Sequence, residues 1–168
     1  EHAVLVSTAG LVTIIGGKWT TYRVMASDAV DRAAEVGDLP RRPCKTAALR
    51  LRGATDSPSQ GTLGEYGSDA PELLKMLRSR PGWDEPLHPS LPYRVGEVVW
   101  AARFELARRV EDVLARRTRS LILDAKASIE AAPRVAALLA EELGFDLTWQ
   151  ADQIRQYQEL AQGYLLPG

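Results

Sequence analysis

The densest group of residues that could do chemistry lies near the start of the chain, at residues 16–23 (GGKWTTYR). Glycine lets the backbone approach a ligand closely, because it has no side chain and tolerates positive φ. The threonines are typical of a helix start, where the first backbone N–H groups have no acceptor and the helix dipole is positive. Lys18 adds a full positive charge beside them. The pattern predicts a cradle for an anion or for a polarised carbonyl oxygen.

A purely structural interpretation of the same residues stays open. Two glycines can make a tight turn between a strand and a helix, and Thr20 or Thr21 can cap that helix. A nucleotide-triphosphate loop is excluded, because its pattern G-x-x-x-x-G-K-[ST] requires a glycine where this chain has Val12 and a hydroxyl residue where it has Trp19.

Two short apolar runs must position this cluster. Residues 3–7 and 11–15 are rich in Val, Leu and Ile, and a connection containing Gly10 separates them. The pattern predicts a β-hairpin, and strands with so few polar residues are typical of strands covered on both faces. Because a two-stranded hairpin is marginally stable alone, it needs further structure to join. The helix after the glycines is expected to stop at Gly37.

The remaining sequence predicts a linker followed by helices. Residues 38–62 mix Pro, Gly, Ser and Arg, which is typical of a linker. Apolar residues at spacings of three and four predict one long amphipathic helix over residues 95–114. Further helices are expected at 71–77, at about 121–131, at 133–143 with Gly144 as its stop, and from a cap at Thr148 onward. The expected fold class is mainly α: a short N-terminal β-hairpin plus a helix, then a helical bundle.

Composition limits the classes of function. The chain has 168 residues, of which 45% are hydrophobic and 26% charged, as in globular proteins with a real core. Its 21 Lys and Arg residues balance 22 Asp and Glu residues, which excludes nucleic-acid binding through bulk positive charge. Cys44 is the only cysteine, so no internal disulfide or cysteine-based zinc site is expected. Because the chain opens at Glu1 and enters an apolar run at once, we expect it to be a C-terminal piece of a larger protein.

Two arginine clusters, residues 108–109 and 116–119, could form a patch for nucleic acid or anionic lipid. Acidic residues are interleaved with them, and Asp112 precedes Arg116 by one helical turn, which favours a solvated, ion-paired helix. Packing of these arginines against a neighbouring domain is a further alternative. No metal site is expected, because neither histidine has a ligand partner at a suitable spacing.

Residues 10–26 (GLVTIIGGKWTTYRVMA) closely resemble the flavin-contacting C-terminal segment of the FAD-dependent, quinone-linked glycerol-3-phosphate dehydrogenases. Residues 96–103 (GEVVWAAR) and 112–119 (DVLARRTR) resemble the C-terminal helical domain of the same enzymes, in which an Asp-Val-Leu-x-Arg-Arg-Thr-Arg run is characteristic. The two motifs occur in the family's order and cover nearly the whole chain.

The resemblance implies a domain organisation. Residues 1–37 would be the C-terminal piece of the FAD-binding and substrate domain, a severed part of an α/β flavoprotein domain. Residues 38–62 would be a linker, and residues 63–168 the C-terminal helical domain.

The resemblance also implies roles for the residues of the turn. Lys18 corresponds to a lysine near the flavin and the substrate, where a cation suits both a reduced flavin and a phosphate ester, so it is also the expected catalytic residue. Arg23 would bind substrate, with an ion pair on the helix surface as the alternative. The implied cofactor-binding residues are Gly16, Gly17, Lys18, Thr20 and Thr21.

The implied enzyme uses FAD to oxidise sn-glycerol 3-phosphate to dihydroxyacetone phosphate and passes the electrons to a quinone. It would be a cytoplasmic protein held peripherally at the inner membrane, with no nucleic-acid partner and with homo-oligomerisation left open. The family's GxGxxG fingerprint does not occur in this chain, so the chain alone is expected to be inactive and not to retain FAD. The mitochondrial member carries a calcium-binding extension, and the lack of a D-x-[DN]-x-[DN]-G loop implies the bacterial type.

Two other functions remain as alternatives. The chain could belong to a related flavin-dependent oxidase that acts on another substrate, which an assay over several substrates would distinguish. Residues 63–168 could instead be a helical protein-interaction module, which would fold alone and bind a specific partner.

Overall fold

The computed structural model describes residues 1–57 and 61–165 and divides the chain into two compact units, Glu1–Leu51 and Arg52–Gly168. The division falls inside the segment 38–62 that the sequence predicts as a linker. Within the described residues the only strands form one antiparallel pair at the N-terminus, and helices follow it. The predicted fold class is therefore confirmed.

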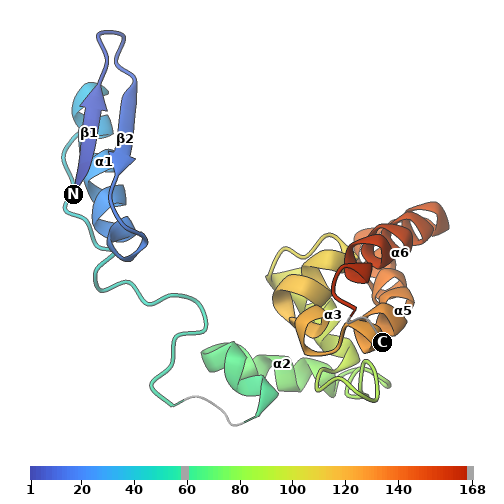
Figure 1. Ribbon diagram of the computed structural model, residues 1–168. Helices are drawn as coiled ribbons and strands as arrows, with labels where there is room; N and C mark the ends of the chain where they lie inside the picture. The colour runs from blue at the N-terminus through green and yellow to red at the C-terminus, as the bar shows by residue number, and fades with distance from the viewer. Residues whose placement is uncertain (58–60, 166–168) are drawn as a thin grey trace. The chain divides into compact units, whose positions relative to one another are not determined.

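The first unit begins with the predicted hairpin, which Figure 1 shows in dark blue. Strand β1 (His2–Val6) pairs with strand β2 (Val12–Gly16), and Val4 lies opposite Ile14. Each strand begins and ends within one residue of the prediction. In the connecting turn the backbone N–H of Gly10 donates to the carbonyl oxygen of Ser7 at 3.0 Å.

One helix packs along this hairpin (Figure 1). A single 3-10 turn, η1 (Trp19–Thr21), leads from β2 into α1 (Tyr22–Val36). An imidazole–carboxylate contact of 2.7 Å between His2 Nε2 and Asp28 Oδ2 ties β1 to α1. The helix ends before Gly37, as predicted.

The first unit has no interior of its own. Among residues 1–57 no side chain is fully buried, and Leu5 and Ile15 of the hairpin are 52% and 51% exposed. The strands are therefore not covered on both faces by the described residues, although their composition is typical of covered strands. The physical reason is that the chain supplies one helix to this hairpin and no further strand among those residues.

The second unit is a helical bundle. Helix α5 (Ala125–Leu143) is central and packs against α3 (Val95–Phe104), α4 (Ser120–Leu123) and α6 (Leu147–Gln162) (Figure 1). The largest core cluster includes the fully buried residues Val98, Val110, Val113, Leu114, Val135, Leu139 and Tyr157. The elements are η2 (Thr62–Asp69), α2 (Ala70–Leu77), α3 (Val95–Phe104), η3 (Asp112–Arg117), α4 (Ser120–Leu123), α5 (Ala125–Leu143) and α6 (Leu147–Gln162).

The prediction of one long helix over residues 95–114 is wrong. Helix α3 ends at Phe104, Leu106 adopts a left-handed conformation with φ +61°, and the chain resumes in the short π-helix η3. The Asp112 carboxylate accepts hydrogen bonds from the backbone N–H groups of Arg108 (2.9 Å) and Arg109 (3.0 Å) and so starts a new turn. The apolar spacing of three and four persists because both segments contact the same core.

The predicted separation of helices at residue 133 is also wrong. Helix α5 runs without interruption through Pro133, which lies on its exposed side. The helix is held on both sides of the proline by buried residues, among them Ala132 and Val135. Gly144 ends the helix with φ +75°, as predicted.

The last helix begins at a different cap from the one predicted. The side chain of Asp146 accepts a hydrogen bond from the backbone N–H of Trp149 at 2.8 Å, whereas Thr148 lies within α6. Aspartate and threonine are both good N-cap residues, so residue type alone could not show which of the two begins the helix.

Candidate functional site

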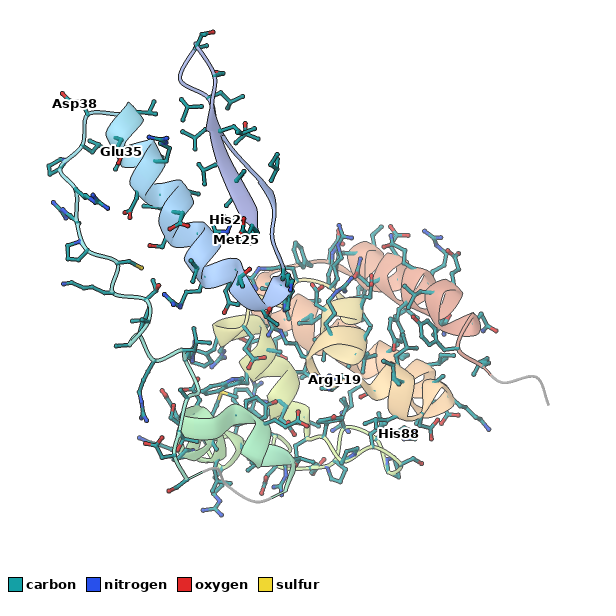
Figure 2. All side chains as sticks on the ribbon, turned by 60° about the vertical axis from the view of Figure 1, so that its left-hand side comes forward. His2, Met25, Glu35, Asp38, His88 and Arg119 are labelled. Carbon is teal, nitrogen blue, oxygen red and sulfur yellow. The ribbon has the colours of Figure 1, made fainter. Side chains whose placement is uncertain are left out.

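The turn between β2 and α1 holds the predicted cofactor-binding residues. Gly16 and Gly17 have φ values of +73° and +83°, which side-chain-bearing residues rarely adopt. A Cβ atom on Gly17 would collide with the side chain of Met25, and one on Gly16 would lie 3.0 Å from the carbonyl oxygen of Glu1. Figure 2 shows Met25 beside His2 at this end of the hairpin. Close packing inside the unit is therefore enough to require both glycines.

The residues after the glycines present polar groups to solvent. Lys18 precedes η1, its side chain is exposed, and Trp19 is 87% exposed. The Thr21 hydroxyl donates to the Lys18 carbonyl oxygen at 2.9 Å, so this threonine closes the turn. The first amides of a helix have no intrahelical acceptor, which leaves those of Trp19 and Thr20 available to a ligand oxygen. The turn thus offers an ammonium group and two amides on one exposed loop.

The structure places Arg23 in a different setting. It lines a largely apolar cavity of about 670 Å³ between α1 and residues 42–51, and neither Lys18 nor the glycines line that cavity. Within the described ranges the Arg23 side chain forms no ion pair, so the alternative of a surface ion pair has no partner there. Arg23 and Lys18 are not brought to one cavity.

Cys44 lies in the same cavity as Arg23. Its sulfur is 3.0 Å from the hydroxyl of Thr46, and this hydrogen bond lowers the pKa of the exposed thiol, with a smaller contribution from the Arg23 charge.

A second, polar cavity of about 540 Å³ lies wholly within the second unit, and sequence reasoning missed it. Four arginines line it: Arg52, Arg116, Arg117 and Arg119. The run at 116–119 was the available signal, but its neighbouring acidic residues favoured a solvated, ion-paired helix. The ion pairs of Arg116 with Asp112 (3.0 Å) and Glu111 (2.6 Å) and of Arg117 with Glu105 (3.7 Å) confirm that interpretation for two of the three arginines in the run.

In the part of the chain that the structure describes, no group of three or more His, Cys, Asp or Glu side chains is arranged to hold a metal ion. In the same residues, no helix combines the length and apolar character needed to cross a bilayer.

Comparison with known proteins assigns the chain to a family. Residues 11–151 match the C-terminal domain of alpha-glycerophosphate oxidase, so the chain belongs to that domain family. It is 37% identical over 95% of its length to the mitochondrial glycerol-3-phosphate dehydrogenase of Mesocricetus auratus, and 33% identical over 98% to that of Homo sapiens. A mitochondrial glycerol-3-phosphate dehydrogenase of Arabidopsis thaliana is 32% identical over 98% of the chain.

These relatives are much longer than the chain. The aligned region covers 24% of the Mesocricetus protein, 26% of the human protein and 31% of the Arabidopsis protein. The family that the sequence motifs resemble is thereby confirmed. The bacterial type stays a prediction, since these three relatives are mitochondrial, and the roles of residues 16–23 stay predictions too.

Proposed function

We propose that this chain forms one wall of the active site of an FAD-dependent dehydrogenase. The enzyme oxidises sn-glycerol 3-phosphate to dihydroxyacetone phosphate and passes the electrons to a quinone. The observation that carries this proposal is the family match over residues 11–151, which includes the glycine–lysine turn. The relatives' names supply the substrate, because each is a glycerol-3-phosphate dehydrogenase.

The residues of the turn fit an FAD molecule. Lys18 carries an exposed ammonium group, and Trp19 and Thr20 contribute amides at a helix start, so these donors suit the carbonyl edge of an isoalloxazine ring. Bound FAD would supply the acceptor for the hydride that leaves the substrate carbon. The positive charge of Lys18 would favour the negative charge that such a transfer brings to the site, and it would also attract the phosphate ester of the substrate.

On this proposal, other parts of the full-length protein complete the active site. The aligned region covers only 24–31% of these relatives, and this chain has no GxGxxG fingerprint. The exposed apolar side chains of the hairpin, Leu5 and Ile15 among them, are the surface on which we expect the remaining flavoprotein domain to pack. On this proposal the isolated chain is inactive and does not retain FAD.

The proposed electron acceptor, a quinone, determines where in the cell we expect the enzyme to act. A quinone is dissolved in the bilayer, so an enzyme that reduces it must touch the membrane surface. We propose peripheral contact with the inner membrane from the cytoplasmic side, with sn-glycerol 3-phosphate and quinone as the partners and no nucleic acid. A homo-oligomer is compatible with this arrangement.

The test is Lys18→Ala in the full-length protein that contains this chain. We expect a loss of about 100-fold in kcat/KM for glycerol 3-phosphate with a quinone acceptor, or loss of bound flavin measured by its absorbance. Lys75→Ala is the matched control, because Lys75 is an exposed lysine on α2 in the second unit.

The role of Lys18 and the identity of the substrate can fail independently of each other. Unchanged turnover and flavin content in Lys18→Ala would remove Lys18 from the site. A wild-type protein that oxidises another hydroxy acid or an amino acid, but not glycerol 3-phosphate, would contradict the proposed substrate.

A further inference from the structure

The polar cavity in the second unit is built from segments far apart in the sequence. It lies where residues 52–53, η2, the loop after α3 and the end of η3 meet. The 52–53 segment is attached to the end of η2, because the Ser68 N–H donates to the Gly53 carbonyl oxygen at 3.0 Å. The cavity is therefore a product of tertiary folding and has no contiguous sequence motif.

Arg52 is fixed at one side of this cavity. Its Nε donates to the Asp69 carboxylate at 2.6 Å, and another of its nitrogens donates to the Phe104 carbonyl oxygen at 3.0 Å. Its guanidinium also lies over the rings of Trp100 and Phe104, at 5.7 Å and 5.4 Å from their centroids. These contacts hold one cation in place before any ligand arrives.

Arg117 is fixed at the other side. It donates to the Glu105 carbonyl oxygen at 2.5 Å, and its Nε lies 3.7 Å from the Glu105 carboxylate. The second of these distances is too long for a hydrogen bond, so part of the guanidinium fork remains available.

Arg119 differs from the other three arginines of the cavity. Within the described residues its guanidinium forms no hydrogen bond and no ion pair, whereas Arg52, Arg116 and Arg117 each have a carboxylate partner. Figure 2 labels it at the start of α4. An arginine without a partner leaves all five of its N–H donors free for a ligand.

The backbone at this cavity is strained. Three residues other than glycine have positive φ in the described chain, and two of them, Leu106 (+61°) and Arg119 (+54°), line this cavity. Such conformations cost free energy and cluster at ligand sites, where they aim a side chain. Here the strain coincides with the one unpartnered arginine of the four.

From these observations we propose that the cavity is a binding site for a small oxyanion, a phosphate or carboxylate group, held by Arg119 with Arg117 and Arg52 in support. Asp69 and Glu105 are occupied by Arg52 and Arg117, which leaves the charge of Arg119 uncompensated by an ion pair. Glu65 also lines the cavity and repels an anion, so the expected affinity is weak, with a dissociation constant on the order of millimolar. This site shares no residue with the proposed flavin turn and does not depend on the proposed function.

The test is a titration of the 168-residue chain with inorganic phosphate, followed by backbone amide NMR at constant ionic strength. Sodium acetate serves as the carboxylate probe in a parallel titration, and sodium chloride sets the baseline. We expect saturable shifts confined to amides near residues 53, 66–69, 105–106 and 117–119. Saturation by phosphate, by acetate or by both identifies which oxyanion the site accepts.

Arg119→Asn is the decisive variant, because asparagine tolerates positive φ and removes the charge. We expect it to weaken binding about tenfold or more, which is the loss of one charge-assisted contact. Arg155→Gln is the matched control and leaves binding unchanged, since Arg155 is an exposed, ion-paired arginine on α6 and does not line the cavity. Arg119→Lys keeps the charge without the planar fork and retains part of the affinity.

Several outcomes would overturn the proposal. They are the absence of saturable shifts with either probe, equal affinities for Arg119→Asn and wild type, or shifts distributed over arginines outside the cavity. If Arg119→Asn fails to fold, the titrations of wild type and of Arg119→Lys test the proposal instead. Saturable amide shifts at the cavity in both proteins support the proposal, and their absence contradicts it.

Discussion

At the scale of single residues, the most consequential group outside the two cavities is the buried carboxylate of Glu97 on α3. It is 1% exposed and accepts hydrogen bonds from the Tyr66 hydroxyl at 2.8 Å and from the Arg94 N–H at 2.7 Å. The Tyr66 contact joins η2 to α3. Burial raises the pKa of Glu97 above its ordinary value despite these hydrogen bonds, and burial beside the carboxylate raises the pKa of Tyr66 as well.

The raised pKa of Glu97 predicts an unusual pH dependence. The folded state binds the Glu97 proton more tightly than the unfolded state, so this group's contribution to the free energy of unfolding decreases as pH rises above the ordinary value of 4.5 toward the raised value. Glu97→Gln removes the titration. We therefore expect the stability of wild type relative to Glu97→Gln to fall as pH increases through this window, measured by urea unfolding at several pH values.

The exposed Glu72 on α2 provides the control for that experiment. Glu72→Gln also replaces a carboxylate by an amide but at an exposed position, so its difference from wild type is the baseline with which the Glu97→Gln difference is compared. A Glu97→Gln difference that grows with increasing pH would contradict the raised pKa.

At the scale of elements, helix α5 determines how the bundle is assembled. It carries Pro133 in its interior, where proline lacks an N–H for the helical hydrogen bond and crowds the preceding turn. The helix continues because its other face is buried against α3, α4 and α6. Burial of the apolar face thus outweighs a local preference against helix.

Pro133→Ala should stabilise the protein. Proline costs about 3 kcal/mol in a helix interior relative to alanine, and the more flexible unfolded chain of the variant offsets up to about 1 kcal/mol of that. We expect the free energy of unfolding to rise by about 2–3 kcal/mol, measured by chemical denaturation.

Pro89→Ala is the control for this prediction, because Pro89 lies in a turn before α3 and has no helix to repair. It should be neutral or slightly destabilising. A decrease in stability for Pro133→Ala would show that the proline supports a bend on which packing depends.

At the scale of the whole molecule, the two units differ in how much they bury. The second unit holds every fully buried residue of the described chain, whereas none lies between residues 1 and 57. A hairpin backed by one helix buries too little apolar surface to be strongly stable without further packing. The two units should therefore open independently and with different free energies.

Hydrogen exchange tests this difference. We expect amides of the hairpin, such as that of Val4, to exchange at least about 100-fold faster than those of α5, such as that of Val135, after correction for intrinsic rates. Exchange followed by mass spectrometry at neutral pH would measure both in one sample. Equal protection in the two units would show that the hairpin unit is as stable as the bundle.

The sequence alone determined the features that depend on local pattern. The hairpin, the stops at Gly37 and Gly144 and the mainly helical bundle follow from residue preferences over a few positions. The family was likewise readable from the sequence, because each of the two motifs, at 10–26 and at 112–119, is a contiguous run of residues.

Only the tertiary structure decided features that depend on distant residues. Apolar spacing could not show that Leu106 interrupts a helix, because both segments bury their apolar residues in one core. It also could not show that Arg119 lacks an ion pair among the described residues whereas Arg117 and Arg52 have one, because Arg117 pairs with Glu105 in the loop after α3 and Arg52 pairs with Asp69 at the end of η2. Local preferences set which elements can form, whereas ion pairing and burial depend on which segments meet, and that is fixed only when the chain is folded.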